Sequence, residues 1–346
     1  MTVLNSQVAH NPIRLSQVDS SGSIQTNRRN FLASVATGVG AACLATTGCV
    51  PNGSIDQPEL VWGRRGMSDG RFLKPRAITI DHNDHLYIVD TTGRIQVFDT
   101  DGQLLRWWKT PQTANGRPTG MATKKIGGVE GKSRLYVADT HYYRMLAYKP
   151  NGELINSEQI GGVAGHSPGE FAFVTDAVCD DEGCIYIGEY GASDRIQKFS
   201  PDGKFITQWG GNGHQPGKFV RPQSLVVDGN TLWVVDACNH RIQRFDVSEE
   251  KPRLIDVWGG EGKSQGKFYY PYDLAIASDS TVLICEYGNQ RIQRFEPNGK
   301  WIASWGGPGF EPGQLYQPWG LVIDSIDRVH ILDSNNHRVQ RISLPS

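Results

Sequence analysis

The sequence has no excess of charge of either sign and almost no long apolar segment. Its 346 residues include 35 Lys and Arg against 36 Asp and Glu, a formal net charge of −1. This balance gives no general attraction to nucleic acid or anionic membranes, so we expect no nucleic-acid partner. Apart from one N-terminal stretch, no apolar run is long enough to cross a bilayer. Glycine (40), proline (18) and aromatic residues (10%) indicate a turn-rich protein of short strands.

The N-terminal stretch is typical of an export signal. Arg28 and Arg29 stand before a Phe-Leu pair and an uncharged run of small residues. This arrangement resembles a twin-arginine signal, and Cys49 resembles the acylated cysteine of a bacterial lipoprotein. We therefore predict an export signal over 1–48, a linker over 49–58, and a periplasmic or cell-surface protein. Two alternatives stay open: a lipid anchor at Cys49, which would be the only membrane attachment, or no anchor.

Beyond this signal, a unit of roughly 45–50 residues repeats six times, which predicts a repeat architecture. In each unit one short strand ends in an acidic residue, and the next begins with arginine and alternates apolar with polar residues. The acidic residues are Asp90, Asp139, Glu189, Asp236, Glu286 and Asp333, and the arginines are Arg94, Arg144, Arg195, Arg241, Arg291 and Arg338. Asp-Gly or Asn-Gly turns then favour a hairpin into a further strand. We predict an all-β, six-bladed β-propeller of four-stranded blades over 59–346.

The two ends of this body complement each other. The sixth unit stops after "RVQRISLPS" and has no fourth strand, whereas "ELVWG" at 59–63 stands alone ahead of the first unit. Elsewhere the same Trp-Gly phrase ends an outer strand and leads into a Gly-rich loop and a proline. We therefore predict that 59–63 completes the last blade and closes the ring, so that no edge is left unpaired.

These motifs resemble the NHL-repeat family of six-bladed propellers. The matching phrases are the inner strand at 318–324, "YVAD" at 136–139, "NHRIQRF" at 239–245 and the Trp-Gly ending. The resemblance implies the fold but not the function, because this scaffold carries enzymes, RNA-binding modules and protein-binding modules. In one enzyme of this fold, a peptide-amidating lyase, zinc is held by histidines that follow inner-strand prolines. No histidine follows those prolines here, so the resemblance does not imply a zinc site.

One mouth of the channel is the predicted position of a ligand site. The loops between blades and the loops after the acidic residues meet at the same face of a propeller, where a concave site is expected. The predicted ligand-binding residues follow the inner-strand prolines: Arg76, Gln223, Tyr272 and Trp319. Arg221 and other basic residues of the Gly-rich loops are predicted to form a solvated rim or to face an acidic ligand.

Blades 3 and 5 differ from the others in the same two places. Both have Glu-Tyr-Gly where other blades have Asp, and both have an inner-strand Asp where others have a small residue. The predicted metal ligands are Asp176, Glu189, Asp273 and Glu286. Four carboxylates at one mouth would repel each other without a cation, and oxygen ligands suit Ca²⁺, Mg²⁺ or Mn²⁺. Alternatively, blades 3 and 5 are recent duplicates whose carboxylates bond locally.

Two functions remain open on the sequence. The first is a monomeric binding module that holds a protein or a small-molecule ligand on its loop face. The second is a divalent-metal-dependent hydrolase or lyase that uses the acidic site, with Tyr190 or Tyr287 as proton donor. Cys179 and Cys184 flank a turn, so a disulfide between them is also open.

Overall fold

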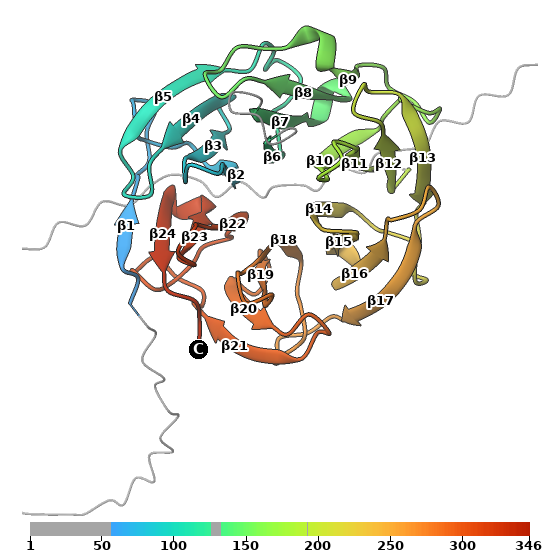
Figure 1. The fold of residues 1–346 in the computed structure, drawn as a ribbon. Coiled ribbons are helices and arrows are strands. Elements are labelled where there is room, and N and C mark those ends of the chain that lie inside the picture. Colours follow the sequence, from blue (N-terminus) through green and yellow to red (C-terminus); the bar gives the residue numbers. More distant parts are fainter. Residues whose placement is uncertain (1–56, 126–132, 192) are drawn as a thin grey trace, which may run out of the picture. The chain divides into compact units, whose positions relative to one another are not determined.

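The computed structural model describes residues 57–125, 133–191 and 193–346, which form a closed ring of six blades (Figure 1). Every blade is an antiparallel sheet of four strands, as the repeats predicted. The predicted export signal, with Arg28, Arg29 and Cys49, lies outside the described residues. The described part of the chain contains no helix that is long and apolar enough to cross a membrane.

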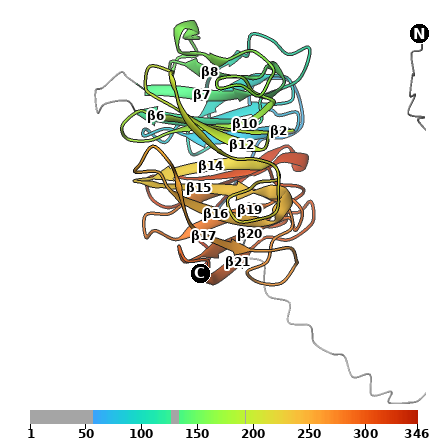
Figure 2. The ribbon, with the colours of Figure 1, turned by 90° about the vertical axis from the view of Figure 1, so that its right-hand side faces the viewer.

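The strands of each blade follow the chain from the channel outward. In a view turned by 90°, β14 to β17 lie one below another (Figure 2). Blade 1 is β2 (Pro75–Ile80), β3 (Leu86–Asp90), β4 (Arg94–Phe98) and β5 (Leu104–Lys109); blade 2 is β6 (Gly120–Lys125), β7 (Ser133–Asp139), β8 (Arg144–Tyr148) and β9 (Ile160–Gly161); blade 3 is β10 (Phe173–Cys179), β11 (Ile185–Tyr190), β12 (Arg195–Phe199) and β13 (Phe205–Gly210). Blade 4 is β14 (Pro222–Asp228), β15 (Thr231–Asp236), β16 (Arg241–Asp246) and β17 (Arg253–Gly259); blade 5 is β18 (Pro271–Ile276), β19 (Val282–Glu286), β20 (Arg291–Phe295) and β21 (Trp301–Trp305); blade 6 is β22 (Gly320–Ile323), β23 (Val329–Asp333), β24 (Arg338–Ile342) and β1 (Leu60–Trp62).

The last blade takes its outer strand from the start of the described chain. β1 pairs antiparallel with β24, with Leu60 opposite Arg341 and Trp62 opposite Val339. The sequence predicted this pairing for 59–63. Four short 3₁₀ helices complete the secondary structure of the described residues: η1 (Thr140–Tyr142), η2 (Asn156–Glu158), η3 (Ala237–Asn239) and η4 (Ser334–Asn336).

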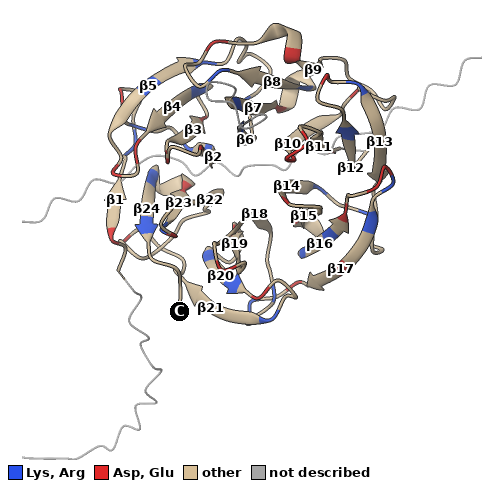
Figure 3. Cartoon of the chain, in the orientation of Figure 1, with Lys and Arg blue, Asp and Glu red and all other residues tan. Residues whose placement is uncertain are grey.

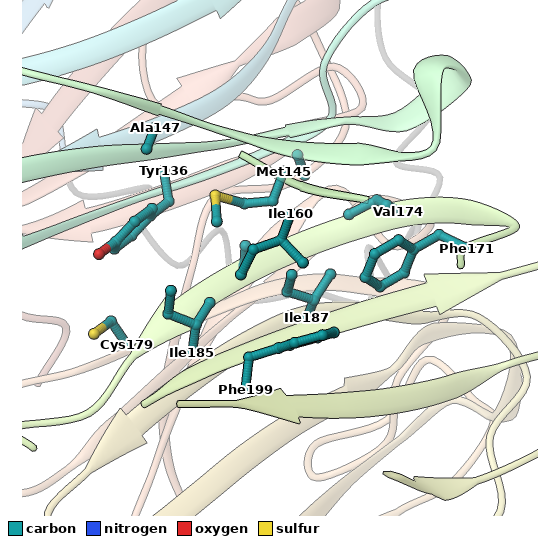
Figure 4. Close-up of a cluster of buried hydrophobic side chains, with 12 residues drawn as sticks. Tyr136, Met145, Ala147, Ile160, Phe171, Val174, Cys179, Ile185, Ile187 and Phe199 are labelled. Carbon is teal, nitrogen blue, oxygen red and sulfur yellow. The ribbon is translucent and has the colours of Figure 1, made fainter. Parts of the chain in front are cut away.

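The hydrophobic core lies mainly between neighbouring blades. Because side chains alternate across each strand, every sheet has two apolar faces, and each face packs on the next blade. Figure 4 shows the cluster between blades 2 and 3, where Met145 and Ile160 meet Ile187 and the rings of Phe171 and Phe199. Fully burying an apolar side chain of this size contributes about 1.5–3 kcal/mol, so these boundaries supply much of the stability.

Tryptophan seals most blade boundaries from the outside. Five of the six outer strands carry one at the same register position, opposite the second residue of the Arg-led strand: Trp62, Trp108, Trp209, Trp258 and Trp305. At three boundaries the indole rests on a glycine in the hairpin turn of the next blade. A Cβ built on Gly102, Gly152 or Gly299 would lie 2.6 Å from the indole of Trp62, Trp108 or Trp258. Any larger residue at these turns would clash with the indole, so glycine is required there.

The turn of blade 3 provides a matched comparison. Gly203 has φ 77°, close to the 85° of Gly299, but the nearest atom to its added Cβ belongs to Ile160, 3.7 Å away. Both alanine substitutions meet similar backbone strain, and only Gly299→Ala meets an indole. We expect Gly299→Ala to lower the free energy of unfolding by about 1–3 kcal/mol more than Gly203→Ala, measured by urea titration. Equal losses would contradict a role of the indole at this turn.

Candidate functional site

The repeated acidic residues anchor the loops that form the mouth of the channel. In blade 4, Asp236 accepts the N–H of Val220 at 2.8 Å and pairs with Arg241 at 2.7 Å. Arg241 and Gln243 in turn donate to the carbonyl of Lys218 at 2.8 and 2.7 Å. Charge-assisted bonds of this kind are stronger than neutral ones, so they fix the Gly-rich loop against its blade.

Glu189 and Glu286 have the same structural role as the aspartates. Glu286 is fully buried, accepts the N–H of Tyr269 at 3.0 Å and pairs with Arg291 at 2.5 Å. Glu189 pairs with Arg195 at 2.5 Å and is also fully buried. Burial raises the pKa of Glu286, and the Arg291 guanidinium opposes this shift. Both carboxylates therefore point under their loops and are satisfied there.

Asp176 and Asp273 lie inside the channel and bond to the neighbouring blades. Their Oδ2 atoms accept the N–H of Leu225 and Leu321, each at 3.0 Å. Ser224, from the blade between them, donates to Asp273 Oδ1 at 2.7 Å. Burial raises the pKa of Asp176 to about 7 and that of Asp273 to about 6. These two carboxyls join the inner strands of blades 3 to 6 and line the channel.

The four predicted metal ligands therefore do not form one site. In the described ranges, no group of three or more His, Cys, Asp or Glu side chains is arranged to hold a metal ion. The physical reason is the length of the side chains and the register of the strands. Glu189 and Glu286 reach back to their own arginines, whereas Asp176 and Asp273 start from the inner strands and reach sideways to the next blade.

The four predicted ligand-binding residues do come together. Arg76, Gln223, Tyr272 and Trp319 line one hollow at the mouth, because each is the residue after the proline of its inner strand. Arg76 lies over the ring of Trp319, with its guanidinium carbon 5.0 Å from the centroid. The ring of Tyr272 stacks on Tyr287 at 4.6 Å and meets Trp319 edge-on at 5.2 Å. The mouth thus has an aromatic wall beside a guanidinium.

A second arginine reaches the same mouth. Arg221 lies over the rings of Tyr190 and Tyr272, at 4.8 and 5.4 Å, and its Nε donates to Gln223 at 2.8 Å. It has φ 62°, so the backbone just before Pro222 is left-handed. The sequence predicted Arg221 only as part of a basic rim. Its proximity to the proline was the signal available, but the turn of the chain there was not predicted.

The mouth is positively charged. Arg117, which the sequence prediction missed, donates to the carbonyl of Thr91 at 2.7 Å, and its charge and that of Arg221 help lower the pKa of Arg76, after the larger effect of burial. Burial and the charges of Arg76 and Arg117 lower the pKa of His141. Arg76 Nε and His141 Nδ1 are buried without hydrogen-bond partners among the described residues. No described carboxylate forms an ion pair with Arg76, Arg117 or Arg221.

The opposite end of the channel is wider. A hollow of about 570 Å³ opens there, lined by the later residues of the inner strands, among them Ile80, Val178, Val227 and Ile276. Asp176 and Asp273 line both this hollow and the mouth, so they separate the two ends.

The cysteines of the described residues are all free. Cys179 lies opposite Ile185 in the sheet rather than opposite Cys184, so the register does not favour the disulfide that the sequence left open. Burial raises the pKa of the Cys179 thiol to about 12.

The fold and this mouth define a closed six-bladed propeller with a basic, aromatic site at one end of its channel. Sequence comparison agrees: the NHL repeat model matches residues 219–245 and 315–342. NHL repeat-containing protein 3 of Mus musculus is 30% identical over 167 residues, which cover 45% of this chain and 46% of that protein. Peptidyl-glycine alpha-amidating monooxygenase of Mus musculus is 34% identical over 130 residues, which cover 34% of this chain and 13% of that protein.

The chain thus contains NHL repeats at 219–245 and 315–342 within its six-bladed propeller, and it spans less than half the length of either curated relative. Solved structures share the fold. A streptogramin B lyase superposes with a TM-score of 0.56 at 13% identity, covering 80% of this chain and 95% of that one. An auxiliary nutrient binding protein from Bacteroides thetaiotaomicron superposes with a TM-score of 0.59 at 14% identity, covering 79% and 69%.

The buried ion pairs predict a strong effect of removing one charge. We expect Glu286→Gln to lower the free energy of unfolding by about 3 kcal/mol, because Arg291 then lies partly buried without its carboxylate. Glu182→Gln, at an exposed turn, is the control and should change it by less than about 0.5 kcal/mol. Chemical denaturation of both variants measures the difference. A stable Glu286→Gln protein would show that this carboxylate is not part of the loop anchor.

Proposed function

We propose that this protein is a monomeric binding module that recognises an anionic group at the mouth of its channel. The ligand is a carboxylate or phosphate joined to a flat apolar group, on a small molecule or at the end of a protein segment. The observation that carries this proposal is a set of three guanidiniums, Arg76, Arg117 and Arg221, at the mouth with no carboxylate partner.

The electrostatics of the mouth support this proposal. Arg76 is partly desolvated, and its Nε has no acceptor within the described chain. A buried donor without an acceptor is costly, and a charged acceptor supplied by a ligand would remove that cost. Guanidinium groups suit carboxylate and phosphate because their donors form a planar fork.

The aromatic wall supports the proposal that the ligand also carries a flat apolar group. Tyr272, Tyr287 and Trp319 form one group of stacked and edge-on rings. Such rings offer apolar area with few rotatable bonds, so little entropy is lost when a flat group packs against them. The ligand therefore presents its charge to the arginines and its flat face to the rings.

The hydrolase or lyase alternative has less support in the geometry. Its four carboxylates divide between loop anchoring and inter-blade bonding, and one relative and one fold neighbour with enzyme names share only part of the chain or only the fold. Tyr287, one of the two predicted proton donors, stacks in the aromatic wall, and Tyr190, the other, lies under the guanidinium of Arg221. We assign them to ligand contact.

A pair of matched ligands tests the binding proposal. Isothermal titration calorimetry of the full chain would compare N-acetyl-phenylalanine with N-acetyl-phenylalaninamide, which has the same ring but no charge, and phenyl phosphate would test the second anion. We expect the acid or the phosphate to bind at least tenfold tighter than the amide. Arg76→Gln or Arg221→Gln should lower the affinity for the anionic ligand at least tenfold.

Arg65→Gln is the control for overall charge, because Arg65 is exposed on a Gly-rich loop outside the mouth. The Arg65→Gln variant should bind the anionic ligand with the same affinity as the unmodified chain. Equal binding of acid and amide, or an unchanged affinity in both mouth variants, would refute the proposal.

We also propose that residues 1–48 export the chain, with a linker over 49–58 and the propeller from 59 onward. The paired Arg28 and Arg29 before an uncharged run support export. We expect Arg28→Lys with Arg29→Lys to keep the protein in the cytoplasm, as measured by cell fractionation. If Cys49 is acylated, Cys49→Ser moves the protein from the membrane to the soluble periplasmic fraction. An unchanged distribution of the double lysine variant would exclude the twin-arginine route.

A further inference from the structure

The boundary between blades 2 and 3 lacks the tryptophan that seals the others. Ile160 lies opposite Met145 in β9, at the register position that tryptophan holds in the other five outer strands. β9 has only two residues, and η2 precedes it in place of a longer strand. The outer face of this boundary is therefore both shorter and less filled.

A pocket opens where the indole is missing. Its volume is about 590 Å³, within the usual range of ligand pockets of about 300–1,000 Å³. Its apolar wall includes Tyr136, Ile160 and Ile185, which belong to the cluster drawn in Figure 4. Gly203, in the turn of blade 3, also lines the pocket, and only Ile160 lies within 4 Å of a Cβ added to it. We call this space the blade 2–3 pocket.

The tyrosine in this pocket has a counterpart next to an indole in each adjacent blade. Tyr87 and Tyr186 hold the same position in β3 and β11, and their rings meet Trp108 and Trp209 edge-on at 6.3 and 6.4 Å. Tyr136 is the corresponding residue of β7, and Ile160 holds the register position that Trp108 and Trp209 hold in those blades. The pocket thus has the tyrosine of this aromatic contact but lacks the tryptophan.

The rim of the blade 2–3 pocket is acidic. Its carboxylates are Glu158, Asp180, Asp181, Glu182 and Asp202, and its basic residues are Lys124 and Arg134. Lys124 pairs with Asp181 at 2.7 Å and Arg134 with Glu158 at 2.7 Å, so both basic side chains are already used. Asp202 pairs at 2.7 Å with Lys204, which lies beside the rim. Two carboxylates, Asp180 and Glu182, therefore have no ion pair among the described residues, and this surplus of negative charge favours a cationic partner.

We propose that the blade 2–3 pocket docks an aromatic side chain, tryptophan above all, that is flanked by lysine or arginine in a segment of a partner protein. The indole fills the space that the chain's own tryptophan fills at other boundaries, and the flanking cations meet Glu182 and Asp202 at the rim. A buried aromatic anchor within a charged rim is the usual arrangement of an interface centre. This proposal is independent of the anion site at the mouth.

The test uses a tripeptide with the full chain. Calorimetry would titrate acetyl-Lys-Trp-Lys-amide, with acetyl-Lys-Ala-Lys-amide and acetyl-Glu-Trp-Glu-amide as comparisons. We expect Lys-Trp-Lys to bind at least tenfold tighter than either. Ile160→Trp places the chain's own indole in the pocket, so it should weaken Lys-Trp-Lys at least tenfold and raise the urea midpoint. Ile326→Trp adds an indole at an exposed site of blade 6 and should leave the affinity unchanged.

A second variant, changed only at exposed charged residues, tests the proposal if Ile160→Trp does not fold. Glu182→Gln with Asp202→Asn alters only exposed side chains, and it should weaken Lys-Trp-Lys several-fold. An affinity that neither Ile160→Trp nor this double variant changes would overturn the proposal. So would equal binding of the alanine peptide. Equal binding of Glu-Trp-Glu would show a neutral aromatic pocket and overturn the basic partner.

Discussion

The structure depends on one repeated interaction, the buried pairing of an acidic residue with the arginine that begins the next strand. A buried charge is tolerated best when its partners satisfy it, as they do in blades 3 to 6. In blades 1 and 2, Arg94 Nε and Asp139 Oδ1 are buried without a partner among the described residues. In blade 4 the carboxylate of Asp236 takes a main-chain amide as well as Arg241, and Arg241 extends its other nitrogens to loop carbonyls. The same set holds the Gly-rich loop in blades 3, 5 and 6. These bonds anchor the loops to their blades and so position the residues after the prolines around the mouth.

The sequence predicted what depends on the repeat and missed what depends on contacts between different repeats. Strand alternation, the acidic strand ends and the closing strand follow from local patterns, and the residues after the prolines converge because each occupies the same register position. The inter-blade bonds of Asp176 and Asp273 do not follow from any local pattern. An added Cβ on Gly120 or Gly320 would lie 2.6 or 2.8 Å from one of these carboxylates, so the small residues there make room for the acid of a neighbouring blade. The sequence contains both the small residues and the acidic residues, but it does not show that they are in contact.

The near-zero net charge conceals two local fields of opposite sign. Figure 3 shows basic and acidic residues distributed around the whole ring. The local field depends on which charges are left without a partner. At the mouth Arg76 and Arg221 contact rings rather than carboxylates, whereas at the blade 2–3 pocket the carboxylates outnumber the basic side chains. A count of charged residues contains neither fact, because it does not record pairing.

Departures from the repeat occur together in blade 2. It lacks the outer tryptophan, and Leu146 stands where the other five Arg-led strands have a glutamine that donates to a loop carbonyl. Arg144 donates to the side chain of Gln112 rather than to loop carbonyls. An unfilled pocket forfeits burial and dispersion contacts that an indole would supply, which is a cost in stability. Proteins keep local costs of this kind chiefly where a site requires the space. The five other boundaries show that this fold accommodates the indole, so the hollow at Ile160 is not imposed by the backbone. Its acidic rim gives the space a chemistry that a simple packing defect would not need.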